Sequence, residues 1–395
     1  PKPQNPRDKI NIYLIIRTPI IILNKRMKSV VSVLAGSVAA NPKCHAIAFS
    51  SGDEDSAYQA GVLKGIVSNP NLTPEDFAYD SVSGVSGGAL NAVMLASFEK
   101  GQEAQAADRM QQFWIDATHN TLYKNWIGGI ARGLFFEGGL YNSAPLQTFL
   151  AKEFKGTTIK RNVDIGIVDV IDGSYKDFSD QQVTEGSNLV DALYASMSFA
   201  GFFPPAEVLG SAWFDGSAVW DIDIFSAVNK CSAKGFANED IVVDVVLTSS
   251  ANLKPVEAED YKSIGMLFRY LEIASYYNSM DGLLRAKFAY EGVNFRYVVS
   301  PSGSIPSSLK PLSLDEKDVQ AAFDMGVKDA NAAIDAGSVA TWDNAIHYHA
   351  LKKKGDPRIM KHTYGSFVEA KAKGEFEEYD ILKDDYMRKY TYKLL

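Results

Sequence analysis

The sequence has little cysteine, little histidine and no excess of positive charge. Its 395 residues include only 2 Cys and 5 His. Two cysteines are too few for a disulfide scaffold, and Cys44 and Cys231 lack the paired spacing of a zinc site. The 48 acidic residues outnumber the 40 basic ones, which gives a net charge of -8. Nucleic-acid-binding proteins concentrate positive charge to displace counterions from phosphates, so we expect no nucleic-acid partner.

Long uninterrupted apolar runs are also missing. The run from Ile10 to Leu23 is broken by Arg17 and Pro19, whereas a membrane-spanning helix needs about 20 apolar residues. From Met27 onward, one lysine is followed by apolar and small residues through position 40, with small residues placed for cleavage. We therefore expect residues 1–40 to be a leader whose signal peptide begins at Met27. Residues 1–26 are either an upstream extension of the reading frame or a native tail.

A signal peptide predicts that the protein is secreted or enters the endomembrane lumen. Without it, we expect a cytoplasmic protein with peripheral membrane contact. Secretion would permit a disulfide between Cys44 and Cys231. The first is expected at the start of a strand and the second near the end of a helix, both at one end of a parallel sheet. Two free buried thiols agree with the sequence equally well.

Strand and helix patterns alternate along the rest of the chain. Apolar runs at 46–49 and 77–82 are each followed by a helical pattern, and 241–247 is a β-branched run typical of a buried parallel strand. Two further runs, 163–171 and 175–178, predict a hairpin. This order predicts an α/β fold of three layers, in which helices cover both faces of a mostly parallel sheet.

The domain organisation follows from where this alternation stops. Helical patterns are expected at about 261–289 and 314–336, and beyond them the sequence becomes charged and weakly periodic. We expect one domain over residues 41–337 and a charged C-terminal extension over 338–395.

A glycine-rich turn, Gly84-Val85-Ser86-Gly87-Gly88, stands between an expected strand and an apolar helix. A serine hydroxyl is a poor nucleophile, so an enzyme places it on a tight turn beside a base. Gly84 and Gly88 permit the close strand-to-helix approach, and the serine lies at the helix N-terminus, where the dipole favours an oxyanion. The pattern indicates Ser86 as a nucleophile; the alternative is a structural Gly/Ser turn.

Two kinds of base could serve Ser86. His347 and His349 fit a Ser-acid-His order, but both fall in the charged extension. The other histidines have no acid or nucleophile nearby in the sequence: His45, His119 and His362. Asp215 follows a short strand and precedes a helix, so it should lie at the carboxyl edge of the sheet with Ser86. A partly desolvated carboxylate touching the serine can act as a base, whereas the alternative is a plain Asp-Gly turn.

Together these segments resemble the patatin-like phospholipase family, whose Ser-Asp dyad hydrolyses acyl esters without histidine. The likeness runs from about His45 to Leu247, and five segments follow the order of the family: 56–63, 84–88, 139–146, 195–205 and 215–216. The resemblance implies a three-layer α/β/α patatin-like fold. It also implies Ser86 as nucleophile, Asp215 as base, and Gly84 and Gly88 as parts of the nucleophile elbow.

The oxyanion loop departs from the family pattern, which is a G-x-G-x-x-G string with a basic residue. Here the stretch is Ser51–Ser56, where Gly52 occupies a variable place and Asp55 replaces Lys or Arg. The backbone N–H groups of Gly52 and Asp53 can still form the oxyanion hole, although Asp53 would adopt the required backbone angles only with strain. Three carboxylates there oppose the developing charge, and losing one oxyanion donor costs about 10²- to 10³-fold in rate.

The resemblance implies a lipid acyl hydrolase of phospholipase A type, with an acyl-enzyme on Ser86 and neither metal nor organic cofactor. Its partner would be a phospholipid or another acyl-ester lipid, with surface contact to a membrane. Aromatic residues at 126–136 and 202–203 would line an acyl groove, touch a lipid surface, or simply pack in the core. Because the oxyanion loop is degraded, the alternative is a weak or inactive protein that binds lipid or a partner. A storage-like protein with incidental esterase activity is the third reading.

Overall fold

The computed structural model describes most of the chain from Pro42 to Ala345. The described residues are 42–179, 188–250, 253, 262–306, 312–338, 340–345 and 349. The expected leader over 1–40 and most of the expected extension over 338–395 lie outside them. The domain boundaries therefore stay predictions.

The described strands form one eight-stranded sheet in the order β5-β6-β3-β2-β1-β7-β8, with β4 also paired to β3. Neighbours from β3 to β8 along this order are parallel, while β4 and β6 run antiparallel to β3 and β5 runs antiparallel to β6. The expected mostly parallel sheet and the expected hairpin are both confirmed. The strands are β1 Cys44–Phe49, β2 Ser81–Val85, β3 Asn162–Asp169, β4 Tyr175–Ser179, β5 Ala206–Val208, β6 Ser211–Asp215, β7 Ile241–Val246 and β8 Asn294–Val299.

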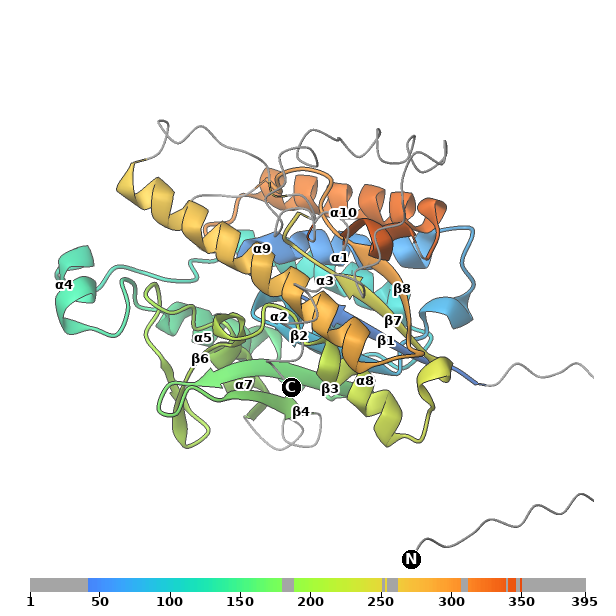
Figure 1. Ribbon diagram of the computed structural model, residues 1–395. Coiled ribbons are helices and arrows are strands. Elements are labelled where there is room, and N and C mark those ends of the chain that lie inside the picture. The colour runs from blue at the N-terminus through green and yellow to red at the C-terminus, as the bar shows by residue number, and fades with distance from the viewer. Residues whose placement is uncertain are drawn as a thin grey trace, which may run out of the picture. The chain divides into compact units, whose positions relative to one another are not determined.

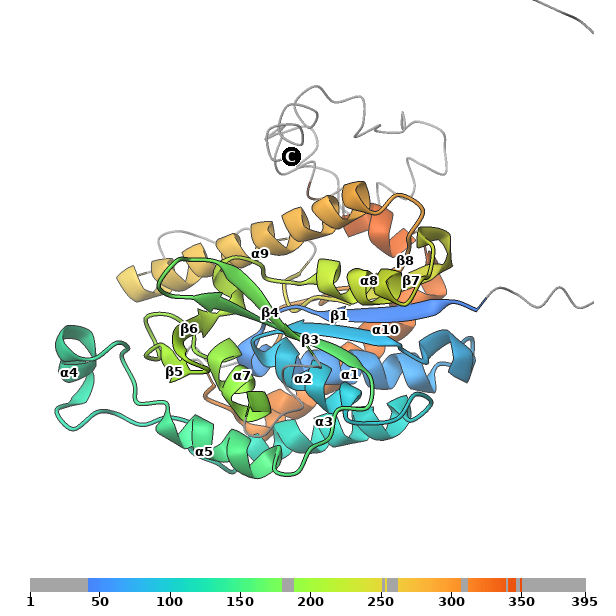
Figure 2. The same cartoon turned by 90° about the horizontal axis from the view of Figure 1, so that it is seen from below.

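Helices cover both faces of this sheet, which gives the three layers visible in Figures 1 and 2. One apolar core lies under α1, α2, α3, α5, α7 and α10, and a second lies under α8 and α9. Side chains of a strand alternate between these cores: Ile47 and Phe49 enter the first, and Cys44, Ala46 and Ala48 enter the second. The helices are α1 Ser56–Ser68, α2 Gly87–Ala96, α3 Glu103–Thr118, α4 Gly129–Phe136, α5 Ala144–Glu153, α7 Asn188–Ser196, α8 Ile224–Ala233, α9 Ser263–Ala289 and α10 Glu316–Ala336.

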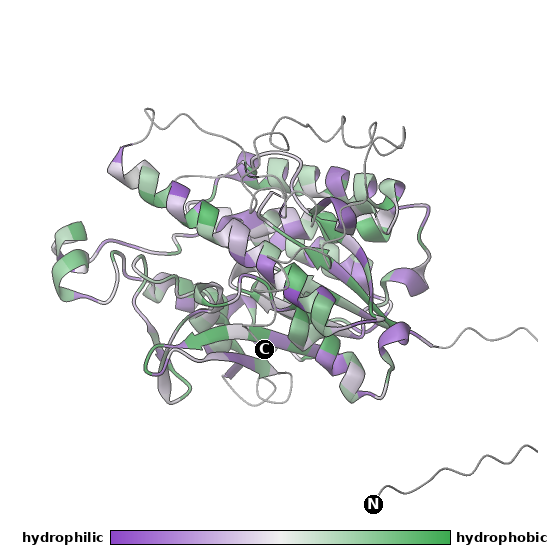
Figure 3. Ribbon diagram, viewed as in Figure 1, coloured by the Kyte–Doolittle hydropathy of each residue, from purple (hydrophilic) through white to green (hydrophobic). Residues whose placement is uncertain are grey.

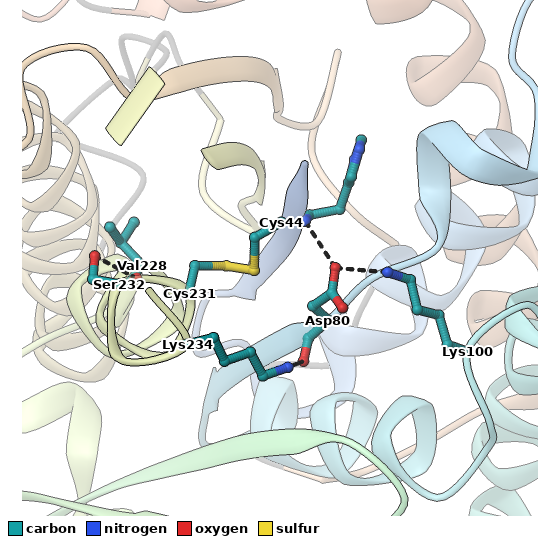
Figure 4. The surroundings of a disulfide bond; sticks show 8 residues. Cys44, Asp80, Lys100, Val228, Cys231, Ser232 and Lys234 are labelled. Carbon is teal, nitrogen blue, oxygen red and sulfur yellow. Dashed lines mark hydrogen bonds and ion pairs between the residues drawn. A yellow bond between two sulfur atoms is a disulfide. The ribbon is translucent and has the colours of Figure 1, made fainter. Parts of the chain in front are cut away.

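The two cysteines form a disulfide that joins the start of β1 to α8 (Figure 4). Their Cα atoms are 5.8 Å apart, although the residues are 187 positions apart in the sequence. Asp80 lies beside this bond, where its carboxylate accepts a hydrogen bond from the His45 N–H at 3.2 Å and pairs with Lys100 at 2.8 Å. Of the two states that the sequence left open, the structure has the disulfide.

The second strand begins later than expected. The pattern predicted a strand over 77–82, but residues Pro74–Phe77 form a 3₁₀ turn and β2 covers Ser81–Val85. The turn has its own local signal, because Pro74 is its first residue and Thr73 and Asp76 form a capping box. Phe77 is buried from this turn, so an apolar side chain there did not require a strand. No helix among the described residues is long and apolar enough to cross a membrane.

Candidate active site

Ser86 occupies the sharp turn between β2 and α2. It has φ 56° and ψ -130°, a conformation that a residue other than glycine rarely adopts, and α2 begins at the next residue. A Cβ on Gly84 would lie 2.3 Å from the Gly88 carbonyl oxygen, and a Cβ on Gly88 would lie 2.2 Å from the Ser50 carbonyl oxygen. Side chains at these two positions would therefore collide with backbone. The strand-to-helix turn expected from the glycines is present.

Hydrogen bonds fix the backbone of Ser86 under the end of α7. Its N–H donates to the Ser196 hydroxyl at 2.8 Å, and that hydroxyl donates to the Gly166 carbonyl of β3 at 2.8 Å. The Ser86 Oγ lies 4.0 Å from the Met197 sulfur. Ser86 is only 1% exposed, so an ester can reach the hydroxyl only after neighbouring side chains move aside.

Asp215 lies beside Ser86, although its strand runs in the opposite direction from the one assumed in the sequence analysis. β6 is antiparallel to β3, with Asp215 opposite Ile167, while Val85 of β2 is opposite Gly166. The strand therefore starts beyond the carboxyl edge of the parallel strands and ends at the level of Ser86. The expected neighbourhood is correct, but the parallel direction behind that expectation is wrong.

The turn after Asp215 makes this approach close. A Cβ on Gly216 would lie 2.6 Å from the Gly166 carbonyl oxygen and 3.0 Å from Val85. The Asp215 N–H donates to the Ser198 carbonyl at 3.1 Å, which ties the aspartate to the segment after α7. One segment, from Ser196 to Ser198, thus holds both Ser86 and Asp215 by their backbones.

Burial dominates the electrostatics of Asp215, which is 2% exposed. Desolvation raises the pKa of its carboxyl to about 6, while hydrogen bonds from the Ser86 hydroxyl and from Ser217 act to lower it. The Ser217 N–H donates to Asp215 Oδ1 at 2.8 Å. A base whose pKa lies near the working pH is the kind that transfers protons efficiently. The aspartate is therefore a far better base than an exposed carboxylate with a pKa near 4.

Asp53 brings a second carboxyl to Ser86. Its Oδ1 lies 3.4 Å from Ser86 Oγ, and its φ of 41° is left-handed. The strain that the sequence analysis expected at this residue is thus present in its backbone. Desolvation, with the charges of Glu54 and Asp215, raises the pKa of the Asp53 carboxyl well above its usual value. The protonated form is favoured, which reduces the repulsion that an oxyanion would meet.

The pKa of the Glu54 carboxyl is also raised. Burial and then the charge of Asp55 raise its pKa to about 8, against the lowering effect of a hydrogen bond from the Leu312 N–H at 2.8 Å. The Asp53–Asp55 turn is therefore less negative at neutral pH than its three carboxyl groups suggest.

The loop before Asp53 is held firmly to the sheet. The Ser51 N–H donates to the Asp221 carbonyl at 2.7 Å, and the Thr248 hydroxyl donates to the Ser51 carbonyl at 2.5 Å. A Cβ on Gly52 would lie 2.4 Å from the Thr248 side chain. Within the described part of the chain, the Gly52 and Asp53 N–H groups have no hydrogen-bond acceptor. Both N–H groups can therefore donate to another acceptor.

The described histidines are engaged elsewhere. His45 lies on β1 and its pKa is lowered, first by burial and then by Arg296. His119 pairs with Glu316 at 3.5 Å. His349 is fully buried, bonds Asp281 of α9 at 3.0 Å and contacts the rings of Tyr276 and Tyr277. His347 and His362 lie outside the described residues. Nothing in these contacts links a described histidine to Ser86.

The sequence assigned no individual role to three residues of the site, although Ser217 departs from the family pattern, which has Gly or Ala after Asp-Gly. Ser196 anchors the Ser86 N–H, Met197 packs against the Ser86 hydroxyl, and Ser217 bonds Asp215. A signal for the first two existed, because they fall in the 195–205 segment that resembles the family. Across the described residues, no group of three or more His, Cys, Asp and Glu side chains could hold a metal ion. The expectation of a cofactor-free site stays a prediction.

Comparisons with known proteins place these residues in context. Residues 47–228 match the sequence model of a family described as "Patatin-like phospholipase", a range that contains Ser86 and Asp215. Among curated protein sequences, no match was found. The crystal structure of VipD from Legionella pneumophila aligns with 79% of this chain and 75% of its own chain, at 9% identity and a TM-score of 0.37.

Proposed function

Because the chain belongs to the patatin-like phospholipase family, we propose that it hydrolyses fatty acyl esters of lipids with Ser86 as nucleophile and Asp215 as base. The observation that carries this proposal is the pairing of the two side chains. The buried Asp215 carboxyl, whose pKa is raised to about 6, lies close enough to the Ser86 hydroxyl for that hydroxyl to act on its pKa. The family match indicates a lipid hydrolase, and the site has a proton acceptor beside a strained serine. Both observations support the same function.

In the proposed reaction, Ser86 Oγ attacks the ester carbonyl carbon while its proton passes to Asp215. The tetrahedral intermediate collapses, the bond to the alcohol breaks, and Asp215 returns the proton to the leaving alcohol oxygen. Water then attacks the acyl-enzyme, with Asp215 again taking the proton, and the fatty acid leaves as Ser86 regains its hydrogen. A phospholipase A-type reaction of this kind requires no cofactor.

The oxyanion of this reaction needs hydrogen-bond donors. Gly52 and Asp53 supply backbone N–H groups in our proposal, and Gly87 adds the N-terminal end of α2. The Asp53 side chain, at 3.4 Å from Ser86 Oγ, must be neutral for this to work. Its raised pKa supports that state.

The second candidate is a protein that binds lipid or a partner without appreciable hydrolysis. The specific observation in its favour is the crowding of the nucleophile, because Ser86 is 1% exposed and has a carboxyl group at 3.4 Å. An Asp53 carboxyl that stays in this place would occupy the space beside the attacking oxygen.

A covalent probe separates the two candidates. A fluorophosphonate reacts with an activated serine, so we expect labelling at Ser86 in the wild type and none in Ser86→Ala. Hydrolysis of a fluorogenic acyl ester should be lost in the same variant. Unchanged hydrolysis in Ser86→Ala would refute the assigned nucleophile, and a folded wild type that takes no label would favour the binding protein. Circular dichroism of both proteins provides the control for folding.

We also propose that the protein acts outside the cytosol, on a phospholipid or other acyl-ester lipid and not on nucleic acid. The pairing of Cys44 with Cys231 supports an oxidising compartment, where disulfides form and persist. Sequencing the N-terminus of the native protein tests this. A start near Ala40 is expected, and an intact Met27 or Pro1 would contradict it.

A further inference from the structure

The described residues expose an unusual number of large apolar side chains at one end of the domain. On and just before α4 these are Ile127, Ile130, Leu134, Phe135 and Phe136, exposed by 94, 50, 61, 72 and 81%. On the first turns of α9 they are Met266, Leu267 and Tyr270, exposed by 45, 51 and 65%. Single exposed apolar residues are ordinary, but contiguous ones mark interaction sites. We call these eight residues the apolar rim.

The rim stands at the catalytic end of the sheet. Figures 1 and 2 both place α4 and the first turns of α9 on the side toward which the parallel strands point their carboxyl ends. In Figure 3, α4 is mostly coloured as hydrophobic although it stands away from the rest of the domain. An apolar helix without a core to cover has to find its apolar partner elsewhere.

Contacts connect the rim to the nucleophile. Met197 touches the Ser86 hydroxyl, and Phe199 and Phe202 stack just beyond it with ring centres 5.4 Å apart. Phe202 lies 5.9 Å from Phe268 of α9 by the same measure. On the α4 side, Leu140 and Tyr141 donate backbone hydrogen bonds to Gly201 and Phe202. A short aromatic path thus leads from beside the buried serine to α9, and backbone hydrogen bonds join the same segment to the residues that follow α4.

The charge of the rim segments agrees with a phospholipid surface as the partner. The whole chain carries a net charge of -8, which an anionic surface repels. With the acid at each end included, the segments that bear the rim, 116–137 and 260–272, contain four basic and four acidic residues: Lys124, Arg132, Lys262 and Arg269, and Asp116, Glu137, Asp260 and Glu272. Arg132 pairs with Glu137 and Arg269 with Glu272, each at 2.6 Å. The rim segments are therefore neutral overall, and a phospholipid surface does not repel them as it repels the acidic chain.

We propose that the apolar rim docks on the surface of a phospholipid bilayer and inserts its exposed side chains at the level of the headgroups, with the catalytic end facing the lipid. This inference rests on the proposed function in one respect, since it assumes that the substrate is a lipid of that bilayer. Helices with an exposed apolar face are typical of segments that lie in a membrane interface. The aromatic path from the rim then brings an acyl chain toward Ser86.

Vesicle sedimentation tests the docking without catalysis. The probe is phosphatidylcholine vesicles, and every protein carries Ser86→Ala so that the lipid stays intact. We expect Phe135→Ser combined with Phe136→Ser to lower the partition coefficient by about tenfold or more, because two large apolar groups no longer insert. The matched control is Phe288→Ser, at the far end of α9 and 37% exposed, which should bind within about twofold of its parent. Binding should persist in about 1 M NaCl, where charge is screened within about 3 Å.

Three outcomes would overturn the proposal. The Ser86→Ala protein does not sediment with vesicles, the double phenylalanine variant sediments as well as its parent, or light scattering shows a dimer that this variant dissociates. In active protein, the double variant should keep its rate on a soluble short-chain ester and lose about tenfold on vesicle lipid. If the wild type hydrolyses neither substrate, the proposed function fails while the sedimentation result still stands on its own.

Discussion

Replacing Asp215 by asparagine should abolish hydrolysis and yet stabilise the fold at neutral pH. The carboxyl is 2% exposed, and its ionised form is disfavoured in the folded protein. Asparagine has the same size, can accept the Ser217 N–H bond through its oxygen, and never ionises. The amide cannot take the Ser86 proton, so activity and stability should change in opposite directions.

The magnitude follows from the shift of the Asp215 pKa. Burial raises it from 3.8 to about 6 in the folded protein. A group with a raised folded pKa contributes stability that is fully present below the unfolded pKa and is lost as the pH rises through the folded pKa. Roughly two pKa units at 1.36 kcal/mol each give about 3 kcal/mol, lost above about pH 6. For roughly 300 ordered residues this corresponds to about 5 °C in Tm.

The assay is urea denaturation of wild type and Asp215→Asn between about pH 3 and 8. We expect nearly equal stability at about pH 3, below the unfolded pKa, and a gap in favour of the variant that grows to about 3 kcal/mol by about pH 7.5. Ser86→Ala is the matched control, since it is also inactive but removes a hydroxyl that lowers the Asp215 pKa. It should be no more stable than the wild type. An Asp215→Asn protein with the stability and pH slope of the wild type would refute the reasoning about burial.

The remaining predictions concern pH, packing and the disulfide. If Asp215 acts as the base in its ionised form, as proposed, kcat/KM should rise with pH through about 6. Any fall in kcat/KM at higher pH should move upward in Asp53→Asn, which cannot ionise there. If kcat/KM of Asp53→Asn falls at the same pH as that of the wild type, ionisation of Asp53 does not cause the fall. Gly88→Ala should lower Tm sharply because its Cβ would lie 2.2 Å from the Ser50 carbonyl, whereas Gly282→Ala in α9, where the nearest contact is 3.3 Å, should not. The Cys44→Ser, Cys231→Ser pair should lose about 5 kcal/mol relative to the oxidised wild type, by loop-closure entropy over the 187-residue separation, as measured by denaturation. The reduced wild type is the control and should match the variant.

Much of the fold was predictable because its signals are local. The glycines around Ser86 predicted the turn, the β-branched run at 241–247 predicted β7, and the 163–178 hairpin is present as β3 and β4. The predicted start of β2 was wrong because Phe77 is buried from a 3₁₀ turn and not from a strand. Hydrophobicity alone does not distinguish the two.

The candidate site was predictable only in part. The resemblance to the family pointed to Ser86 and Asp215, and the structure places them beside each other across the end of β3. The direction of β6 relative to β3 could not be read from the sequence, because a short run such as Ser211–Asp215 fits a strand of either direction. The position of the Asp53 side chain could not be predicted either. The spacing showed that Asp53 lies in the loop that is glycine-rich in the family, but not that its carboxyl would lie against Ser86.

By itself, the sequence determined the features that depend on neighbouring residues: the sharp turn at Ser86, the alternation of strand side chains between two cores, and the order of strands and helices. Steric limits on a few consecutive backbone angles decide these. Only the tertiary structure decided that Cys44 meets Cys231 across 187 residues and that Asp53 lies beside Ser86 across 33. Likewise, only the tertiary structure shows that the apolar side chains of α4 are exposed. Such contacts depend on how whole layers pack, and no local spacing fixes that.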